Sequence, residues 1–228
     1  MKRLLRILLC LGVLFTGSSL FFVLLYKWMP VNLTPLMMIR CVEQVRKDKP
    51  LRWEHRWIPG KKIPDRLRMA VICAEDQNFF NHNGFDFNAI RQAVKESEAG
   101  GKRLRGASTI SQQTAKNLFL WPGRNWVRKG LEAWFTALIE FFWSKERILN
   151  VYLNIIETGD GIYGAEAAAY AYFGIPASRL SVHQSAAIAA ILPNPLKYSA
   201  SSPGPFISGR ISWIMGQMQQ YGPLQKKR

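Results

Sequence analysis

Apolar residues follow two different patterns along this chain. Residues 7–26 are almost uncharged and consist mostly of Leu, Val, Ile and Phe. Further along, apolar and polar positions alternate with the period of a helix, and within residues 67–74 apolar side chains recur at positions i, i+3, i+4 and i+7. The pattern predicts one continuous apolar segment followed by a series of amphipathic helices.

Start and stop signals divide the later part of the chain into helices. Asp86 is placed to cap one helix, and Ser181 with Gln184 forms the capping box of another. Gly159 and Gly174 are expected to end helices. Because no series of strands and no internal repeat is found, the predicted class is mainly α. Further helices are predicted from residue 65, over 109–120, 125–143, 145–158 and 164–173, and through a last stripe of Ile207, Ile211, Ile214, Met215 and Met218.

The continuous apolar segment is long enough to cross a membrane. About 20 helical residues at 1.5 Å each match the ~30 Å hydrocarbon core of a bilayer. Basic residues precede the segment at Lys2, Arg3 and Arg6. The alternative is a cleaved signal peptide with a break around residues 16–19, but the apolar run resumes beyond them. An uncleaved transmembrane anchor is therefore preferred.

The charges that flank this segment are equivocal about its orientation. The basic residues just beyond the span outnumber those before it, at Arg40, Arg46, Lys47 and Lys49. Long domains translocate largely regardless of charge, so a short head inside and a large domain outside are permitted. We therefore expect a cytoplasmic head over residues 1–6, a transmembrane helix over 7–27, a tether over 28–50, a globular domain over 51–222 and a basic tail over 223–228.

The composition agrees with one folded domain behind an anchor. A chain of 228 residues suffices for one domain of ordinary size, and 48% hydrophobic with 12% aromatic residues excludes intrinsic disorder. The net charge of +16 and the pI near 10.1 indicate an anionic partner: nucleic acid, acidic lipid headgroups or a phosphorylated substrate. Charge alone does not choose among these partners.

The cysteines and histidines predict no metal site. Cys10, Cys41 and Cys73 are too few and too scattered for a disulfide framework, and no pair has metal-ligand spacing. A bridge between Cys41 and Cys73 is left open. The histidines are also too scattered for a metal site, and none is assigned a catalytic role: His55, His82 and His183.

Glu75, in the block EDQNFFNHNG, is a candidate general base. It directly follows the apolar face of its predicted helix and precedes Phe79 and Phe80, so we expect it to be partly desolvated. Desolvation raises the pKa of a carboxyl group and suits it to accept a proton. Considered alone, a solvated acid at the end of a helix is an equally good interpretation, so the context of Glu75 must decide.

The block GASTISQQTAKNLF is a candidate phosphate site. It places Gln112, Gln113 and Lys116 on one face of a helix that begins near the hydroxyls of Ser108 and Thr109. Free backbone amides, hydroxyls and an ammonium at a helix N-terminus suit a phosphate group. The alternative is an ordinary capped amphipathic helix.

Basic residues continue after this helix. Arg124, Arg128 and Lys129 follow, and Glu132 lies one helical turn after Arg128. These residues form either an anion-binding cluster or a salt-bridged helix surface.

The blocks together resemble the motifs of the peptidoglycan glycosyltransferases, glycosyltransferase family 51. EDQNFFNHNG resembles the first motif, GASTISQQTAKN the second and RKGLE the third. KERILNVYLNIIETGDGIYGAEAAAYAYFG is similar to the fourth motif and LSVHQSAAIAAILPNPLKYS to the fifth. The resemblance covers residues 65–200 with all five blocks in order. Two departures, Gly106-Ala107-Ser108 for Gly-Gly-Ser and Gln184 for Glu, touch no expected catalytic group.

The resemblance implies a lysozyme-like, mainly α domain over residues 51–222 that polymerises glycan strands. In this family a strand carried by undecaprenyl pyrophosphate is transferred to the GlcNAc 4-hydroxyl of lipid II, with inversion to a β-1,4 link and release of undecaprenyl pyrophosphate. No Ser-x-x-Lys with Lys-Thr-Gly pattern occurs and few residues follow position 200, so a monofunctional enzyme is expected.

The resemblance also implies roles for single residues. Glu75 matches the family's base, and Glu132 matches its second glutamate, which orients cations or shapes the pyrophosphate environment. Fixed cations stabilise the charge that gathers on a leaving pyrophosphate. No dedicated metal ligands are found, and a divalent cation such as Mg or Mn is left open. The expected substrate-binding residues are Ser108, Gln112, Gln113, Lys116, Arg124, Arg128 and Lys129.

The expected partners are lipid II, the nascent glycan strand, the bacterial inner membrane and other cell-wall synthesis proteins, with the catalytic domain in the periplasm. The helix over residues 126–143 mixes basic residues with Trp134, Phe135, Phe141 and Phe142, as an interfacial segment does. For about half of these residues a buried core helix is an equally good interpretation.

Three other functions compete with strand synthesis. A membrane-tethered enzyme that cleaves peptidoglycan would also use a glutamate, but cleavage of an internal glycosidic bond releases no pyrophosphate for the cations to stabilise. A nucleic-acid-binding protein is disfavoured by the membrane span and by the lack of a recognisable reader motif. The intact blocks give no reason for a noncatalytic scaffold.

Overall fold

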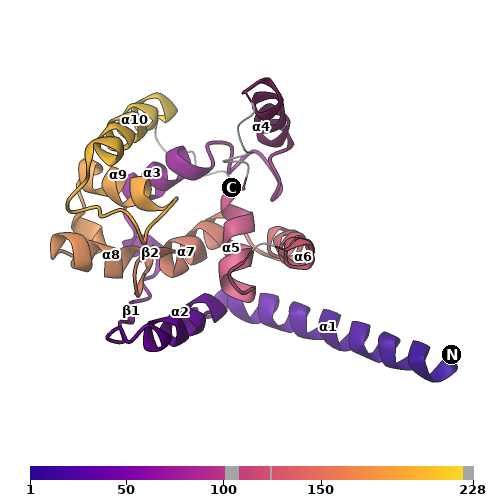
Figure 1. The fold of residues 1–228 in the computed structure, drawn as a ribbon. Helices are drawn as coiled ribbons and strands as arrows, with labels where there is room; N and C mark the ends of the chain where they lie inside the picture. The colour runs from indigo at the N-terminus through magenta and orange to yellow at the C-terminus, as the bar shows by residue number, and fades with distance from the viewer. Residues whose placement is uncertain (101–107, 124, 223–228) are drawn as a thin grey trace.

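The computed structural model describes residues 1–100, 108–123 and 125–222 and is mainly helical (Figure 1). Its first helices are α1 (Lys2–Trp28), α2 (Pro35–Arg46), α3 (Asp65–Glu75), α4 (Phe87–Gly100) and α5 (Ile110–Phe119). They are followed by α6 (Trp126–Phe142), α7 (Lys145–Ile155), α8 (Gly164–Phe173), α9 (Val182–Ile191) and α10 (Pro205–Tyr221). Short 3-10 helices lie at η1 (Gly60–Lys62) and η2 (Ala177–Arg179).

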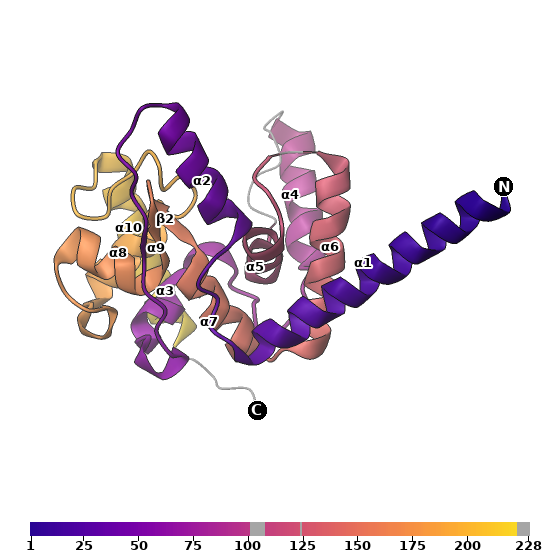
Figure 2. The same ribbon diagram turned by 90° about the horizontal axis from the view of Figure 1, so that it is seen from below.

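Helix α1 projects from the body of the molecule as a single rod (Figures 1 and 2). Among the described helices it alone is long and apolar enough to cross a membrane. Its C-terminal part is fixed to the body, because Trp143 Nε1 donates to the carbonyl of Val23 at 2.8 Å and Arg147 donates to the carbonyl of Tyr26 at 2.6 Å. Helix α1 therefore leaves the domain in a defined direction.

The segment expected to be a tether contains helix α2, which packs on the domain. Thr34 caps it by accepting from the Met37 amide, and Pro35 begins it with a fixed φ. Arg40 on α2 donates to both carboxylate oxygens of Glu157, at 2.8 and 3.0 Å. Residues 35–46 therefore form a helix that is held on the domain.

The core lies where two groups of helices meet. Helix α3 packs against α9 and α10, and α5 packs against α6 and α7. Leu67, Ile110, Ile148, Ile188 and Ile214 from these helices are almost fully buried in one cluster. Helix α5 also contacts α2, so it packs against three helices.

A small sheet replaces the end of one predicted helix. Strands β1 (Glu54–His55), β2 (Glu157–Gly159) and β3 (Ile162–Tyr163) pair in the order β1-β3-β2, with β1 parallel and β2 antiparallel to β3. The helix predicted over 145–158 therefore ends at Ile155, and Gly159 lies in a strand. A Cβ on Gly159 would lie 2.7 Å from the Tyr172 hydroxyl, so this position needs glycine for close packing.

Most predicted helix boundaries are confirmed. Asp86 accepts from the amides of Asn88 and Ala89 at the start of α4, and Ser181 with Gln184 forms the capping box of α9. Gly174 ends α8 in the left-handed conformation at φ 66°. The stripe on α10 is buried at Ile207, Ile211, Ile214 and Met218, while Met215 is half-buried. The cysteines that were left open for a bridge, Cys41 and Cys73, are both free.

Candidate active site

Glu75 lies at the C-terminal end of α3, in a nearly dry environment. Its side chain is 13% exposed. Oε2 accepts from Gln113 Nε2 at 3.0 Å, and Oε1 lies 3.5 Å from Arg210 Nη2. Burial raises the pKa of the Glu75 carboxyl above its ordinary value, against the opposing effects of Gln113, Arg210 and Lys116. The predicted desolvation of Glu75 is confirmed, and its carboxylate can accept a proton.

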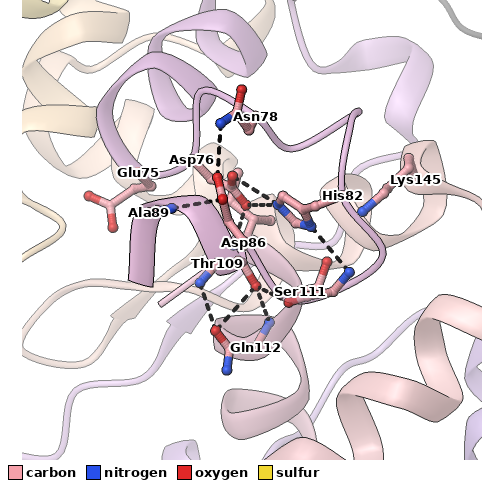
Figure 3. Close-up of polar contacts among 12 residues, drawn as sticks. Glu75, Asp76, Asn78, His82, Asp86, Ala89, Thr109, Ser111, Gln112 and Lys145 are labelled. Carbon is pink, nitrogen blue, oxygen red and sulfur yellow. Dashed lines mark hydrogen bonds and ion pairs between the residues drawn. The ribbon is translucent and has the colours of Figure 1, made fainter. Parts of the chain in front are cut away.

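The loop after Glu75 is tied to the start of α5 by Asp76. Its Oδ2 accepts from the Ile110 amide at 2.9 Å and from His82 Nε2 at 3.0 Å. His82 Nδ1 in turn accepts from the Gly84 amide, and the Thr109 hydroxyl donates to the Gly84 carbonyl at 2.6 Å. In Figure 3 the Glu75 carboxylate points away from this network. Asp76 and His82 therefore hold the loop while Glu75 remains available for other contacts.

Gln112 belongs to the cap of α5. The side-chain Oε1 of Gln112 accepts from the backbone amide of Thr109 at 3.1 Å, and the backbone amide of Gln112 donates to Thr109 Oγ1 (Figure 3). The residue is 4% exposed. The sequence placed Gln112 on the same face as Gln113 and Lys116. In the structure Gln113 and Lys116 line the same cavity and Gln112 does not, because the side-chain oxygen of Gln112 accepts a hydrogen bond in the capping box.

Gln113 connects Glu75 to a second group of polar residues. Its amide nitrogen donates to Glu75, while its Oε1 accepts from the hydroxyl of Tyr152 at 3.1 Å. Tyr152 is fully buried, so it fixes the orientation of the amide. A cavity of about 330 Å³ lies beyond Gln113 and is also lined by Lys116 and Arg128.

The basic residues after α5 form a cluster around Glu132. Arg128 Nη1 lies 2.9 Å from Glu132 Oε2, and Lys129 Nζ contacts the other carboxylate oxygen. Arg128 and Glu132 are 7% and 3% exposed, whereas Lys129 is about half exposed. Burial lowers the pKa of Lys116; Glu132 opposes the shift, and the positive charges of Arg128 and Lys129 add to it. Lys116, Arg128 and Lys129 therefore share one neighbourhood.

Two further residues of this cavity were missed by the sequence analysis. Arg40 and Glu157 line it together, as an ion pair between α2 and β2. Arg40 was placed in the tether and considered only for its charge. The pairing joins residues 117 positions apart, so no local spacing could reveal it.

A separate cavity of about 220 Å³ lies on the other side of Glu75. Ser108, a predicted substrate-binding residue, lines it together with Asp76 and Trp213. Ser108 is therefore next to the candidate base and not in the cavity lined by Lys116. Arg124 lies outside the described residues, as do the basic loop over 101–107 and the basic tail over 223–228.

The acidic residues of the site are bound to nitrogen donors. Across residues 1–100, 108–123 and 125–222, no group of three or more His, Cys, Asp or Glu could hold a metal ion. Both oxygens of Glu132 face cationic side chains. The site is thus organised around fixed cations and one desolvated carboxylate.

Comparison with known proteins identifies the family. A family model described as "Transglycosylase" matches residues 43–219 of the chain. The chain belongs to the transglycosylase family. The match begins within α2 and ends within α10, so it includes the cavity beside Glu75 and all the described candidate residues of this transglycosylase, while Arg40 of the other cavity lies before it.

Curated relatives are similar over nearly the whole chain. A "Biosynthetic peptidoglycan transglycosylase" of Pseudomonas putida strain W619 is 54% identical, over 91% of this chain and 88% of its own length. Proteins with the same name from Stutzerimonas stutzeri and Bacteroides thetaiotaomicron are 54% and 51% identical, covering 90% and 99% of this chain and 84% and 92% of their own lengths. The chain is therefore an enzyme, and its fold is of the lysozyme-like, mainly α class expected from the sequence.

Proposed function

We propose that this transglycosylase polymerises the glycan strands of peptidoglycan from lipid-linked disaccharides. One observation carries the proposal: a desolvated carboxylate, Glu75, is joined through Gln113 to a cavity lined by Lys116 and Arg128. A base next to a cation-lined cavity suits a transfer in which an alcohol attacks and a pyrophosphate leaves. The similarity to biosynthetic peptidoglycan transglycosylases supports the same chemistry.

The proposed reaction has one chemical step. Glu75 removes the proton from the 4-hydroxyl of the GlcNAc residue of lipid II, and that oxygen attacks the anomeric carbon of the growing strand. The bond from this carbon to the undecaprenyl pyrophosphate oxygen breaks, and the pyrophosphate leaves with the electron pair. Because attack and departure occur on opposite faces, the α-linked donor becomes a β-1,4 link. Glu75 then holds the proton and releases it to solvent.

The cations are proposed to stabilise the leaving pyrophosphate. Negative charge gathers on it in the transition state, so positive groups fixed beforehand lower the barrier. Lys116, Arg128 and Lys129 supply these groups, and Arg124 is assigned to the same role from the sequence. Glu132 is a positioning residue in this proposal, because its two oxygens hold Arg128 and Lys129.

Other candidate residues have supporting roles. Ser108 lines the cavity beside Glu75 and is proposed to contact a substrate there. Gln113 orients the Glu75 carboxylate and also lines the cavity that contains Lys116 and Arg128. Gln112 supports the start of α5 through its cap. Within the part of the chain that the structure describes no metal site is formed, and we derive no step through Mg or Mn.

The substrates carry long lipids, so the enzyme is proposed to work at the outer face of the bacterial inner membrane. Helix α1 supplies the single-pass anchor, with residues 1–6 in the cytoplasm and the domain in the periplasm. Trp126 and Phe141 on α6 are 91% and 82% exposed, which suits contact with the bilayer surface. The orientation is tested by fusing, after Arg228, a reporter that is active only in the cytoplasm. Activity of this fusion would contradict the proposed orientation.

An assay with two substrates separates strand synthesis from peptidoglycan cleavage. The purified full chain is incubated with lipid-linked disaccharide and, separately, with purified cell wall. The proposal predicts polymer and released undecaprenyl pyrophosphate from the first and no soluble fragments from the second. Release of fragments without polymer would show a cleaving enzyme instead.

A further inference from the structure

The outer face of α10 carries an aromatic groove. Phe206, Arg210 and Trp213 follow one another at i, i+4 and i+7, each one residue before a member of the buried stripe, so they form a face of the helix beside that stripe. Phe206 is 68% exposed and Trp213 is 48% exposed. With Pro205 and Gly209 these side chains line a groove of about 480 Å³. Two large aromatic side chains are thus presented on a surface where burial in the core does not explain them.

This groove is continuous with the neighbourhood of Glu75. Trp213 lines both the groove and the cavity beside Glu75, so its side chain is common to the two hollows. Arg210 lines the groove as well, donates to the carbonyl of Ala74 at 3.3 Å, and lies 3.5 Å from Glu75 Oε1. A molecule that occupied the groove would therefore extend directly to the candidate base.

The chemistry of the groove suits a saccharide. One face of a pyranose ring is a layer of C–H groups that packs on an aromatic ring, while its hydroxyls project from the edge towards polar donors. Phe206 and Trp213 offer the aromatic faces, and Arg210 between them offers the donors. Tyr198, whose ring lies 5.8 Å from that of Phe206, extends the aromatic surface.

The position of the groove favours a strand over a lipid. Helix α10 and the free end of α1 lie on opposite sides of the body in both views (Figures 1 and 2). A lipid chain must return to the bilayer that α1 enters, whereas a growing strand must leave it. The incoming lipid II is short and remains close to the membrane, so the groove suits the longer of the two substrates.

We propose that Phe206 and Trp213 form a platform that binds the saccharide units of the growing glycan strand, behind the unit that reacts at Glu75. This inference rests on the proposed function and names a surface for the donor outside the reacting centre. Each transfer lengthens the strand on this platform, so donors longer than a disaccharide gain contacts that the acceptor does not make. Trp213 is a specificity-determining residue for donor length.

Kinetics with separate donor and acceptor test the platform. We compare Trp213→Leu, Trp213→Phe and the parent in two titrations. In the first a lipid-linked tetrasaccharide donor is varied at saturating lipid-linked disaccharide acceptor, and in the second the acceptor is varied at saturating donor. For Trp213→Leu the donor KM is expected to rise about tenfold, the scale of truncating an aromatic contact in a recognition site, with kcat and the acceptor KM within about twofold. Trp213→Phe retains a ring and is expected to lie between the two. The control is Trp53→Leu, because Trp53 is 44% exposed and lines neither the groove nor the cavity beside Glu75.

A binding measurement keeps this test separate from the proposed function. The chain is labelled with 5-fluorotryptophan, which gives eight fluorine resonances for its eight Trp, and the Trp213 signal is assigned as the one missing from Trp213→Phe. A lipid-free GlcNAc–MurNAc tetrasaccharide should shift the Trp213 signal and leave that of Trp53 in place. If this shift occurs in a protein that makes no polymer, the proposed function fails and the platform stands. An unshifted Trp213 signal, or a rise in the acceptor KM alone, would overturn the platform.

Discussion

The two glutamates of the site have the same side chain and opposite surroundings. Glu75 and Glu132 are both largely buried, at 13% and 4% side-chain exposure. Glu75 accepts one hydrogen bond from a neutral amide and has its nearest cationic nitrogen, on Arg210, at 3.5 Å. Glu132 has Arg128 at 2.9 Å on one oxygen and Lys129 in contact with the other.

This difference separates a group that can exchange a proton from one that fixes its neighbours. Burial raises the pKa of Glu75 and outweighs the opposing effects of Gln113, Arg210 and Lys116, so its proton affinity suits a base. The two cations on Glu132 occupy its acceptors, so its main effect is on the positions and charges of Arg128 and Lys129. The number and distance of the cations around each carboxylate, and not the residue type, indicate its role.

The largest effect is expected from Glu75→Gln. The substitution keeps the size and hydrogen bonding of the side chain but removes the proton acceptor. We expect kcat for polymer formation to fall by about two to four orders of magnitude, the usual range for the loss of a general base. Gel analysis of polymer from lipid-linked disaccharide measures the loss, and an unchanged melting temperature confirms that the variant is folded.

Lys116→Ala and Arg128→Ala should have the next largest effects. Each removes one positive group from the proposed pyrophosphate site, and we expect kcat to fall by about 10- to 100-fold, which is less than for Glu75→Gln. Release of undecaprenyl pyrophosphate in a single-turnover experiment measures the effect. Lys62→Ala, in the 3-10 helix η1, controls for a general loss of basic charge. Unchanged kinetics in both site variants would remove these residues from the site.

Glu132→Gln should act through its cations. It leaves the buried Arg128 without its carboxylate, so we expect a loss of about 3 kcal/mol in the free energy of unfolding, measured by denaturant titration. Glu132 also raises the pKa of Lys116, so its removal should move the alkaline limb of the pH–activity profile to lower pH. The effect on activity should change with added salt or divalent metal. A Glu132→Gln variant whose activity changes with neither salt nor divalent metal would contradict the positioning role.

The smallest effect is expected from Arg210→Gln. Arg210 lowers the pKa of Glu75, so its removal should raise that pKa further. A base acts only when it is deprotonated, and activity is lost as the pH falls through its pKa. The acidic limb of kcat/KM should therefore move to higher pH, with little change on the plateau. A limb that stays in place would show that Arg210 does not influence the base.

Local signals in the sequence were sufficient for the helices and for part of the site. The apolar face before Glu75 predicted its burial, and the i, i+4 spacing of Arg128 and Glu132 predicted their contact, because both depend on residues within two helical turns. The capping box of Thr109 and Gln112 was not predicted as such. The start of this helix was interpreted as a candidate phosphate site, with an ordinary capped amphipathic helix as the alternative, because a cap and a binding face can share the same helix start.

Contacts between distant segments could not be predicted in this way. Arg210 reaches Glu75 from the last helix, and Arg40 reaches Glu157 across 117 positions. These pairs depend on where α2 and α10 pack on the core. The apolar stripe of α10 predicts that the helix is packed, but not which elements it meets. Strand β2 was missed for a related reason. This three-residue strand gains its hydrogen bonds from β3 and is too short to show an alternation of its own.

Chemical rescue tests the central claim, that Glu75 is the base and Glu132 is not. Glu75→Ala and Glu132→Ala are purified, their folding is checked by thermal melting, and polymer formation is measured with increasing formate, a small carboxylate that can enter the space left by the side chain. The account predicts that formate restores part of the activity of Glu75→Ala in proportion to its concentration and leaves Glu132→Ala unchanged. Equal rescue of both variants, or a folded Glu75→Ala that polymerises at the parent rate without formate, would contradict it.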